Sequence, residues 1–252
     1  MTIVASWNGD GLSDGTTFNT STAGTGDNNF DVVSGSFTIR NGGLYSPRIE
    51  MNQQSGQAAE FRWTEASLGV GPYPQHALRF YLELTGHPPG NGQLCSAKAM
   101  DNSNFWWMDI TSAGILRLRD TGGSAKALSS AALPIDQELR IEVVADGTDV
   151  SVFVYVGEST VPIQTLNGTG FSGVVATHRL QFGNTNTTPT YPKTSWDSIA
   201  FADEAVLIGA INPEEPPTTS LYLWDGSEEL PLSVDGVWDG SVAIPMGSIE
   251  VA

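Results

Sequence analysis

The sequence predicts an all-β protein built as an antiparallel β-sandwich. Short segments of alternating apolar and polar residues recur along the chain, and glycine- and proline-containing turns separate them. No segment keeps the apolar spacing of an amphipathic helix for more than about two turns. The 252 residues include 28 glycines and 14 prolines, and 40% are hydrophobic. This composition excludes a helical bundle and a disordered acidic chain, and the length suits one sizeable sandwich core.

The chain opens with a segment, 1–29, that is rich in Gly, Ser, Thr, Asn and Asp. We expect it to be an extended arm, or an irregular first strand, lying on the main body with Trp7, Phe18 and Phe30 as its anchors. Alternation from Phe30 onward then predicts six strands, at 36–40, 57–63, 77–84, 93–99, 104–110 and 115–119.

A β-hairpin follows, with arms at 139–145 and 150–156. Both arms are rich in β-branched residues, and the join contains Asp146-Gly147, a pair typical of hairpin turns. Two further strands are predicted at 179–183 and 195–201. These elements define the expected sandwich, residues 30–211.

The last part of the chain has a different character. Lys193 is the last basic residue, and the eleven acidic residues after it give 194–252 a charge of −11 out of a net −17. Three prolines in 212–219 predict a stiff linker. We therefore expect a separate, small acidic β module over 220–252.

This module contains a short repeat. Leu223-Trp224-Asp225-Gly226-Ser227 recurs fourteen residues later as Val237-Trp238-Asp239-Gly240-Ser241. Each copy predicts a strand, an Asp-Gly turn and a strand, and two copies form a unit too small to be stable alone. It would dock on the sandwich, pair with other copies of the chain or insert into a partner, through contacts of Trp224, Asp225, Trp238 and Asp239.

Charge and motifs exclude several classes of function. A net charge of −17 repels nucleic acid and anionic membranes. The first seven residues lack the basic and apolar regions of a signal peptide, so we expect synthesis in a cytoplasm. The single cysteine, Cys95, excludes an intrachain disulfide and is expected to be buried.

Catalytic motifs are missing from the sequence. His76, His87 and His178 have no zinc-ligand spacing, and there is no P-loop or nucleophile elbow. A glycosidase needs two carboxylates across the scissile bond. The best strand carboxylates, Asp109 and Glu142, have no same-face acidic neighbour nearby in sequence. We therefore expect no enzyme and no cofactor.

Calcium is the one metal with candidate ligands. Hard oxygen donors occur together in two places, at Asp10 and Asp14 and at Asp27, Asn28, Asn29 and Asp31. Their spacing does not match an EF-hand loop. Turn chemistry explains these residues equally well, and both interpretations stay open.

Trp106 and Trp107 are the candidate ligand-binding residues. They are adjacent on a predicted strand, so one faces the core and the other faces away. The outward ring would stack a sugar or contact a partner. Alternatively, it packs under a loop such as 83–92 or 184–194.

Several segments in this order carry a family resemblance. They are Phe30-Asp31-Val32-Val33-Ser34-Gly35-Ser36, Leu78-Arg79-Phe80-Tyr81-Leu82, the hairpin 139–156, Leu180-Gln181-Phe182-Gly183 and Trp196-Asp197-Ser198-Ile199-Ala200-Phe201. Together they resemble minor tail proteins of tailed phages that infect actinobacteria. The resemblance covers about 1–211 and implies a concanavalin A-like, laminin-G-like jelly roll.

The resemblance also implies a function. We expect a non-enzymatic virion protein, made in the host cytoplasm, that assembles as a homo-oligomer with other virion proteins of the tail or capsid. A minor tail protein that contacts host glycan is the leading interpretation. A head decoration or fibre protein of the same fold, and a stand-alone carbohydrate-binding module, are the alternatives.

Overall fold

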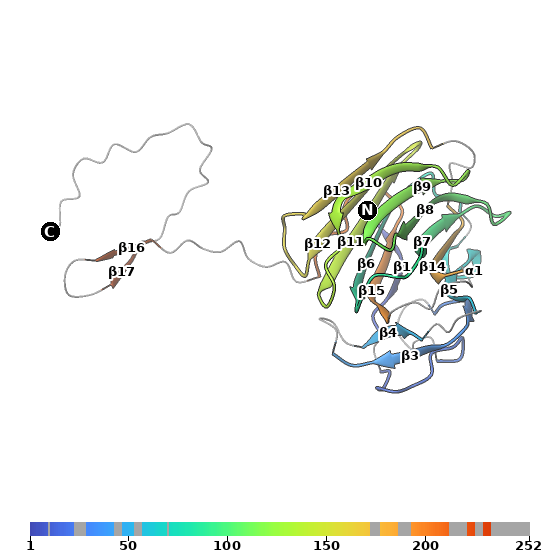
Figure 1. Ribbon diagram of the computed structural model, residues 1–252, viewed down its shortest axis with the longest axis horizontal. Helices are drawn as coiled ribbons and strands as arrows, with labels where there is room; N and C mark the ends of the chain where they lie inside the picture. Colours follow the sequence, from blue (N-terminus) through green and yellow to red (C-terminus); the bar gives the residue numbers. More distant parts are fainter. Residues whose placement is uncertain are drawn as a thin grey trace. The chain divides into compact units, whose positions relative to one another are not determined.

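The computed structural model divides the chain into two compact units, Met1–Glu214 and Glu215–Ala252 (Figure 1). The boundary falls within the range predicted as a linker. The structure describes residues 1–9, 11–22, 29–42, 47–52, 57–69, 71–171, 177–185, 193–211, 221–224 and 229–232. The predicted linker, 212–219, lies outside these ranges.

The first unit is an antiparallel jelly-roll β-sandwich, which confirms the predicted fold class. One sheet has eight strands in the order β13-β12-β11-β6-β15-β4-β3, with β1 also paired to β15. Their bounds are β1 Ile3–Trp7, β3 Phe37–Arg40, β4 Arg48–Met51, β6 Gln75–Leu84, β11 Glu138–Asp146, β12 Asp149–Val156, β13 Gln164–Gly168 and β15 Thr194–Ala202.

The second sheet has seven strands in the order β10-β9-β8-β7-β14-β5-β2. Their bounds are β2 Val32–Ser34, β5 Ala59–Trp63, β7 Gly92–Lys98, β8 Asn104–Ile110, β9 Ile115–Asp120, β10 Ala125–Ala132 and β14 Arg179–Asn184. A single short helix, α1 Glu65–Leu68, follows β5 in the described part of the chain. The structure has a strand at each position predicted within the sandwich, and the hairpin β11–β12 pairs Asp146 with Asp149 across its turn.

The core lies between the two sheets and is rich in aromatic rings. Phe61 and Phe182 stack with ring centroids 5.2 Å apart, and Phe30 stacks on Trp63 at 4.7 Å. Trp196 meets Phe61 edge-on from the opposite sheet. Such ring pairs add roughly 0.5–1.5 kcal/mol each beyond the area that they bury.

Of the two interpretations of residues 1–29, the structure supports a first strand that lies on the main body. Strand β1 pairs with β15 and so belongs to the eight-stranded sheet. Trp7, Phe18 and Phe30, the predicted anchors, are at most 3% exposed and belong to the main core. The sandwich therefore begins near residue 3 and not at 30, because these three rings bury their area only when the segment joins the body.

The chain that leaves β15 lies on the outer face of the eight-stranded sheet. The Gly209 N–H donates to Glu142 Oε2 at 2.9 Å, and its carbonyl accepts from Arg79 Nη1 at 3.0 Å. The Ile211 N–H donates to the Tyr81 hydroxyl at 3.3 Å. This segment, 203–211, covers part of that face.

The second unit contains a hairpin within its described residues. Strand β16, Leu221–Trp224, pairs antiparallel with β17, Glu229–Leu232. These strands correspond to the first copy of the repeat. The second copy, with Trp238 and Asp239, lies outside the described residues, as does Asp225.

Among the described residues, no helix is long and apolar enough to cross a membrane.

Candidate functional site

The alternation of β8 separates the two candidate tryptophans. Trp106 faces the core, is 0% exposed, and its indole N–H donates to His76 Nε2 at 3.1 Å. It is therefore unable to stack a ligand at the surface, and its assignment as a glycan contact is wrong. Trp107 faces outward and is partly exposed, with its N–H donating to the Asp120 carbonyl at 3.0 Å.

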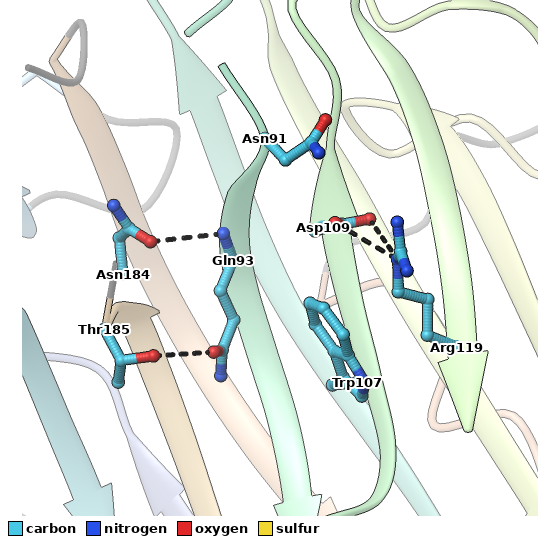
Figure 2. Close-up of a pocket in the computed structure, with 7 residues that line it drawn as sticks. All are labelled: Asn91, Gln93, Trp107, Asp109, Arg119, Asn184 and Thr185. Carbon is cyan, nitrogen blue, oxygen red and sulfur yellow. Dashed lines mark hydrogen bonds and ion pairs between the residues drawn. The ribbon is translucent and has the colours of Figure 1, made fainter. Parts of the chain in front are cut away.

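Trp107 lines a pocket of about 350 Å³ on the outer face of the seven-stranded sheet (Figure 2). The lining residues come from neighbouring strands and the loops at their ends. They are Asn91, Gln93, Trp107, Asp109, Arg119, Asn184 and Thr185. This lining combines one aromatic ring with six polar or charged residues, so it is more polar than the mostly apolar lining of a typical small-molecule site.

Two arginines hold the carboxylate of Asp109. Arg117 donates from Nε to Asp109 Oδ1 at 2.8 Å and from Nη2 to Oδ2 at 2.5 Å. Arg119 Nε donates to the same carboxylate at 3.3 Å. This fork follows from the register, because Asp109 lies directly opposite Arg117 in the β8–β9 ladder. The carboxylate is 1% exposed, so its main role here is to orient the guanidinium groups.

Arg119 links this ion pair to the aromatic face. Its guanidinium lies 5.0 Å from the centre of the Trp107 ring, within the range of a cation–π contact. Trp107 and Arg119 are also register partners on β8 and β9. The indole is therefore held on both sides, by the guanidinium and by the hydrogen bond to Asp120.

The opposite wall of the pocket is made of amides. Thr185 Oγ1 donates to Gln93 Oε1 at 3.0 Å, and the Gln93 amide nitrogen donates to Ser96 Oγ at 3.1 Å. The Gln93 backbone N–H donates to Asn184 Oδ1 at 3.4 Å. Figure 2 shows Trp107 and Asp109 on β8 between this wall and Arg119. These contacts fix the side chains before any ligand arrives.

The described lining of the pocket contains no histidine and no cysteine. Asp109 is the one carboxyl among its described lining residues. His76 lies behind Trp106 in the core, where burial lowers its pKa to about 4. Burial raises the pKa of the Cys95 thiol well above its usual value, as expected for an inert buried cysteine.

Two of the candidate calcium ligands, Asp31 and Asp14, accept hydrogen bonds from other segments of the chain. Asp31 accepts from the Thr64 backbone N–H at 2.6 Å and from the Ser67 hydroxyl at 2.8 Å, beside α1. Asp14 accepts from the Asn41 backbone N–H at 3.0 Å. Asp10, Asp27 and Asn28 lie outside the described residues. Within the described ranges, His, Cys, Asp and Glu form no group of three or more suited to a metal.

Sequence reasoning found Trp107 and Asp109 but missed the rest of the pocket. Asn184 and Thr185 lie more than 90 positions from Gln93, and the pairing of β14 with β7 brings them together. Arg119 carried a weak signal, since it alternates with Arg117 on a predicted strand.

Comparison with solved structures finds sandwich proteins at low sequence identity. The Trypanosoma rangeli sialidase in complex with the inhibitor DANA is 13% identical with a TM-score of 0.53, over 81% of this chain and 31% of the sialidase. The alginate lyase AlgAT5 from Polysaccharide Lyase family 7 is 10% identical with a TM-score of 0.50, over 65% of this chain and 81% of the lyase. The botulinum neurotoxin serotype D binding domain is 9% identical with a TM-score of 0.51, over 81% of this chain and 49% of that domain.

These similarities establish the fold and nothing finer. This chain spans less than a third of the length of the sialidase. No family model matches the sequence, and comparison with curated proteins finds no match. The neighbours include enzymes, a sialidase and an alginate lyase, as well as a toxin binding domain. The function of this chain is therefore argued from its own pocket.

Proposed function

We propose that this protein is a non-catalytic glycan-binding sandwich that holds a sugar ring against Trp107. The observation that carries the proposal is the pocket itself: an outward indole clamped by Arg119, facing a wall of hydrogen-bonded amides. An apolar sugar face suits the indole, and the hydroxyl groups suit the amides and the guanidinium.

In this proposal the protein binds the glycan without cleaving it. Cleavage by paired carboxylates needs two acids on either side of the bond. The described lining of this pocket offers Asp109, whose oxygens are already engaged by Arg117 and Arg119. The site is built to bind and orient a sugar.

The resemblance in the sequence supports a biological setting for this binding. We propose that the protein belongs to a phage virion, as a minor tail protein that contacts host glycan through the sandwich. A head decoration protein of the same fold is the alternative. In either position, the module after residue 219 would join copies of the chain to each other or to other virion proteins.

Titration of a broad set of glycans against the full chain tests the binding function. Trp107→Ala is expected to weaken binding by about tenfold, equal to roughly 1.4 kcal/mol. The matched control is Phe153→Ala, which removes a partly exposed aromatic ring from β12 in the other sheet and should leave binding unchanged.

Two results would overturn the proposal. The first is no binding of any glycan at high protein concentration, and the second is unchanged binding by the Trp107 variant. Chromatography of the bound glycan after long incubation tests the non-catalytic part, and a cleavage product would refute it.

A further inference from the structure

A straight row of outward residues crosses five strands and passes through the pocket. Each residue is the register partner of the next, from β5 through β14, β7 and β8 to β9. The row consists of Arg62, Gln181, Ser96, Trp107 and Arg119. Neighbouring strands lie about 4.8 Å apart, so the row is about 19 Å long. Its partly exposed members, Arg62, Trp107 and Arg119, mark a track for an extended ligand that lies across the strands, while Gln181 and Ser96 between them are 2% and 0% exposed.

This face concentrates the positive charge of an acidic protein. Five of the 11 Lys and Arg residues occupy outward positions here, namely Arg62, Lys98, Arg117, Arg119 and Arg179. Three acids accompany them, namely Glu60 and Asp109 on the strands and Glu65 on α1. The face therefore carries a positive surplus, while the whole chain has a net charge of −17.

Three of these five positive residues, Arg62, Lys98 and Arg179, lie at the end of the track away from Trp107. Lys98 is the register partner of Arg179. Burial lowers the pKa of the Lys98 ammonium, and the charges of Arg62 and Arg179 lower it further, against an opposing effect of Glu60. Arg62 pairs with Glu60 at 3.5 Å, and Arg179 Nε donates to both carboxylate oxygens of Glu65 at 3.3 Å. Glu60 and Glu65 thus offset two of the three positive charges of this cluster, which leaves a surplus of one.

Two donors in the same part of the track have no acceptor among the described residues. They are Gln181 Nε2 and Arg62 Nε, both buried. Gln181 is 2% exposed and lies directly between Arg62 and Ser96 in the row. A buried donor without an acceptor costs free energy, and a ligand oxygen that displaced the side chains over it would recover that cost.

We propose that this track binds an acidic polysaccharide, with one sugar ring on Trp107 and an anionic group of a neighbouring unit at the cluster of Arg62, Lys98 and Arg179. This inference rests on the proposed glycan function and names the class of glycan. The overall negative charge does not prevent such contact, because charges more than about 8 Å apart are screened at physiological salt. The sheet selects for anions locally while the rest of the chain repels them.

The test is the affinity of the full chain for three polymers of matched length: a polyuronate, a phosphodiester-linked polyol and a neutral glucan. The wild-type chain is expected to bind an acidic polymer at least tenfold more tightly than the glucan. If the polyuronate binds more tightly, the anion is a carboxylate, and if the phosphodiester-linked polyol binds more tightly, it is a phosphate. Arg62→Gln combined with Lys98→Gln is expected to remove the preference and leave the Trp107-dependent binding of neutral sugar intact.

The control is Arg40→Gln, which removes one positive charge from β3 in the other sheet, where the side chain is 37% exposed. This variant should bind all three polymers as tightly as the wild-type chain does. Arg179→Gln is the second variant, since it lies at the start of β14 and should weaken acidic binding even if the double variant is poorly folded.

Equal affinity for acidic and neutral polymers refutes the inference, as does tight acidic binding by both the double variant and Arg179→Gln. If Trp107→Ala then still weakens neutral binding by about tenfold, the glycan function stands and only the choice of an acidic glycan fails. If no polymer binds, both proposals fail.

Discussion

Protonation of His76 should control the stability of the sandwich in mild acid. The imidazole is 0% exposed and stacks on Trp106 at a centroid distance of 6.1 Å. Its Nε2 accepts the Trp106 indole N–H, so the other nitrogen, Nδ1, carries the proton and donates to the Tyr73 carbonyl at 3.2 Å. Both nitrogens are used in the neutral form, and a second proton would meet an N–H donor.

The size of the effect follows from the pKa. Burial lowers the pKa of His76 from 6.5 to about 4, against a smaller opposing effect of the Tyr73 hydrogen bond. Between these values the unfolded chain binds a proton that the folded chain does not. The free energy of unfolding therefore keeps the full contribution of His76 above pH 6.5 and falls as the pH drops towards 4. Below pH 4 the protonation of His76 lowers it no further. The difference corresponds to roughly 3 kcal/mol.

Urea denaturation at several pH values between 4 and 7.5 measures this loss. The matched variant is His76→Gln, whose amide can accept from Trp106 and donate to Tyr73 but does not titrate. We expect the variant to be less stable at pH 7.5 because of its poorer packing, and the gap to the wild type to shrink by about 3 kcal/mol at pH 4. A gap that stays constant over this range would show that His76 is not the titrating group.

Three further predictions concern other parts of the chain. Burial raises the pKa of Asp197 from 3.8 to about 8, so folding disfavours its ionised form and stability falls as the pH rises between these values. Asp197→Asn should reduce the difference in melting temperature between pH 5 and pH 9. An unchanged difference would show that Asp197 is not the titrating group. Gly183 has φ +96°, and a Cβ there would lie 2.3 Å from the Ala59 carbonyl oxygen. Gly183→Ala should therefore lower the free energy of unfolding, measured in urea, by roughly 1–3 kcal/mol. A variant that unfolds at the same urea concentration as the wild type would show that the alanine is not strained. Deletion of 212–252 should leave the melting temperature of the sandwich unchanged, because the first unit has its own core. The same deletion should abolish oligomers in sedimentation experiments. Oligomers of the shortened chain would show that the module does not form the contact between copies.

Regular strands could be predicted because their pattern is local. The segment 104–110 alternates and became β8 with the same bounds, and the hairpin join at Asp146-Gly147 is the turn of β11–β12. Strand β10, Ala125–Ala132, was missed because it is an exposed edge strand of mostly small residues without clear alternation. The three- and four-residue strands β2 and β4 are too short to show a period.

The segment 1–29 could not be assigned to the sandwich for a different reason. Its turn-rich composition is typical of a surface segment, and only pairing with β15, nearly 200 residues away, makes β1 a strand of the sheet. Local sequence carries no record of such a partner.

By itself, the sequence determined the class of fold, the two-sided character of the Trp106–Trp107 pair and the acidic, separate end of the chain. These features depend on residue types and on a period of two, both of which can be read over a few positions. The tertiary structure decided which tryptophan faces out, which residues share its pocket, and that Arg62, Gln181, Ser96, Trp107 and Arg119 form one row. That row depends on the register between strands, and register is set by how the two sheets close over a common core.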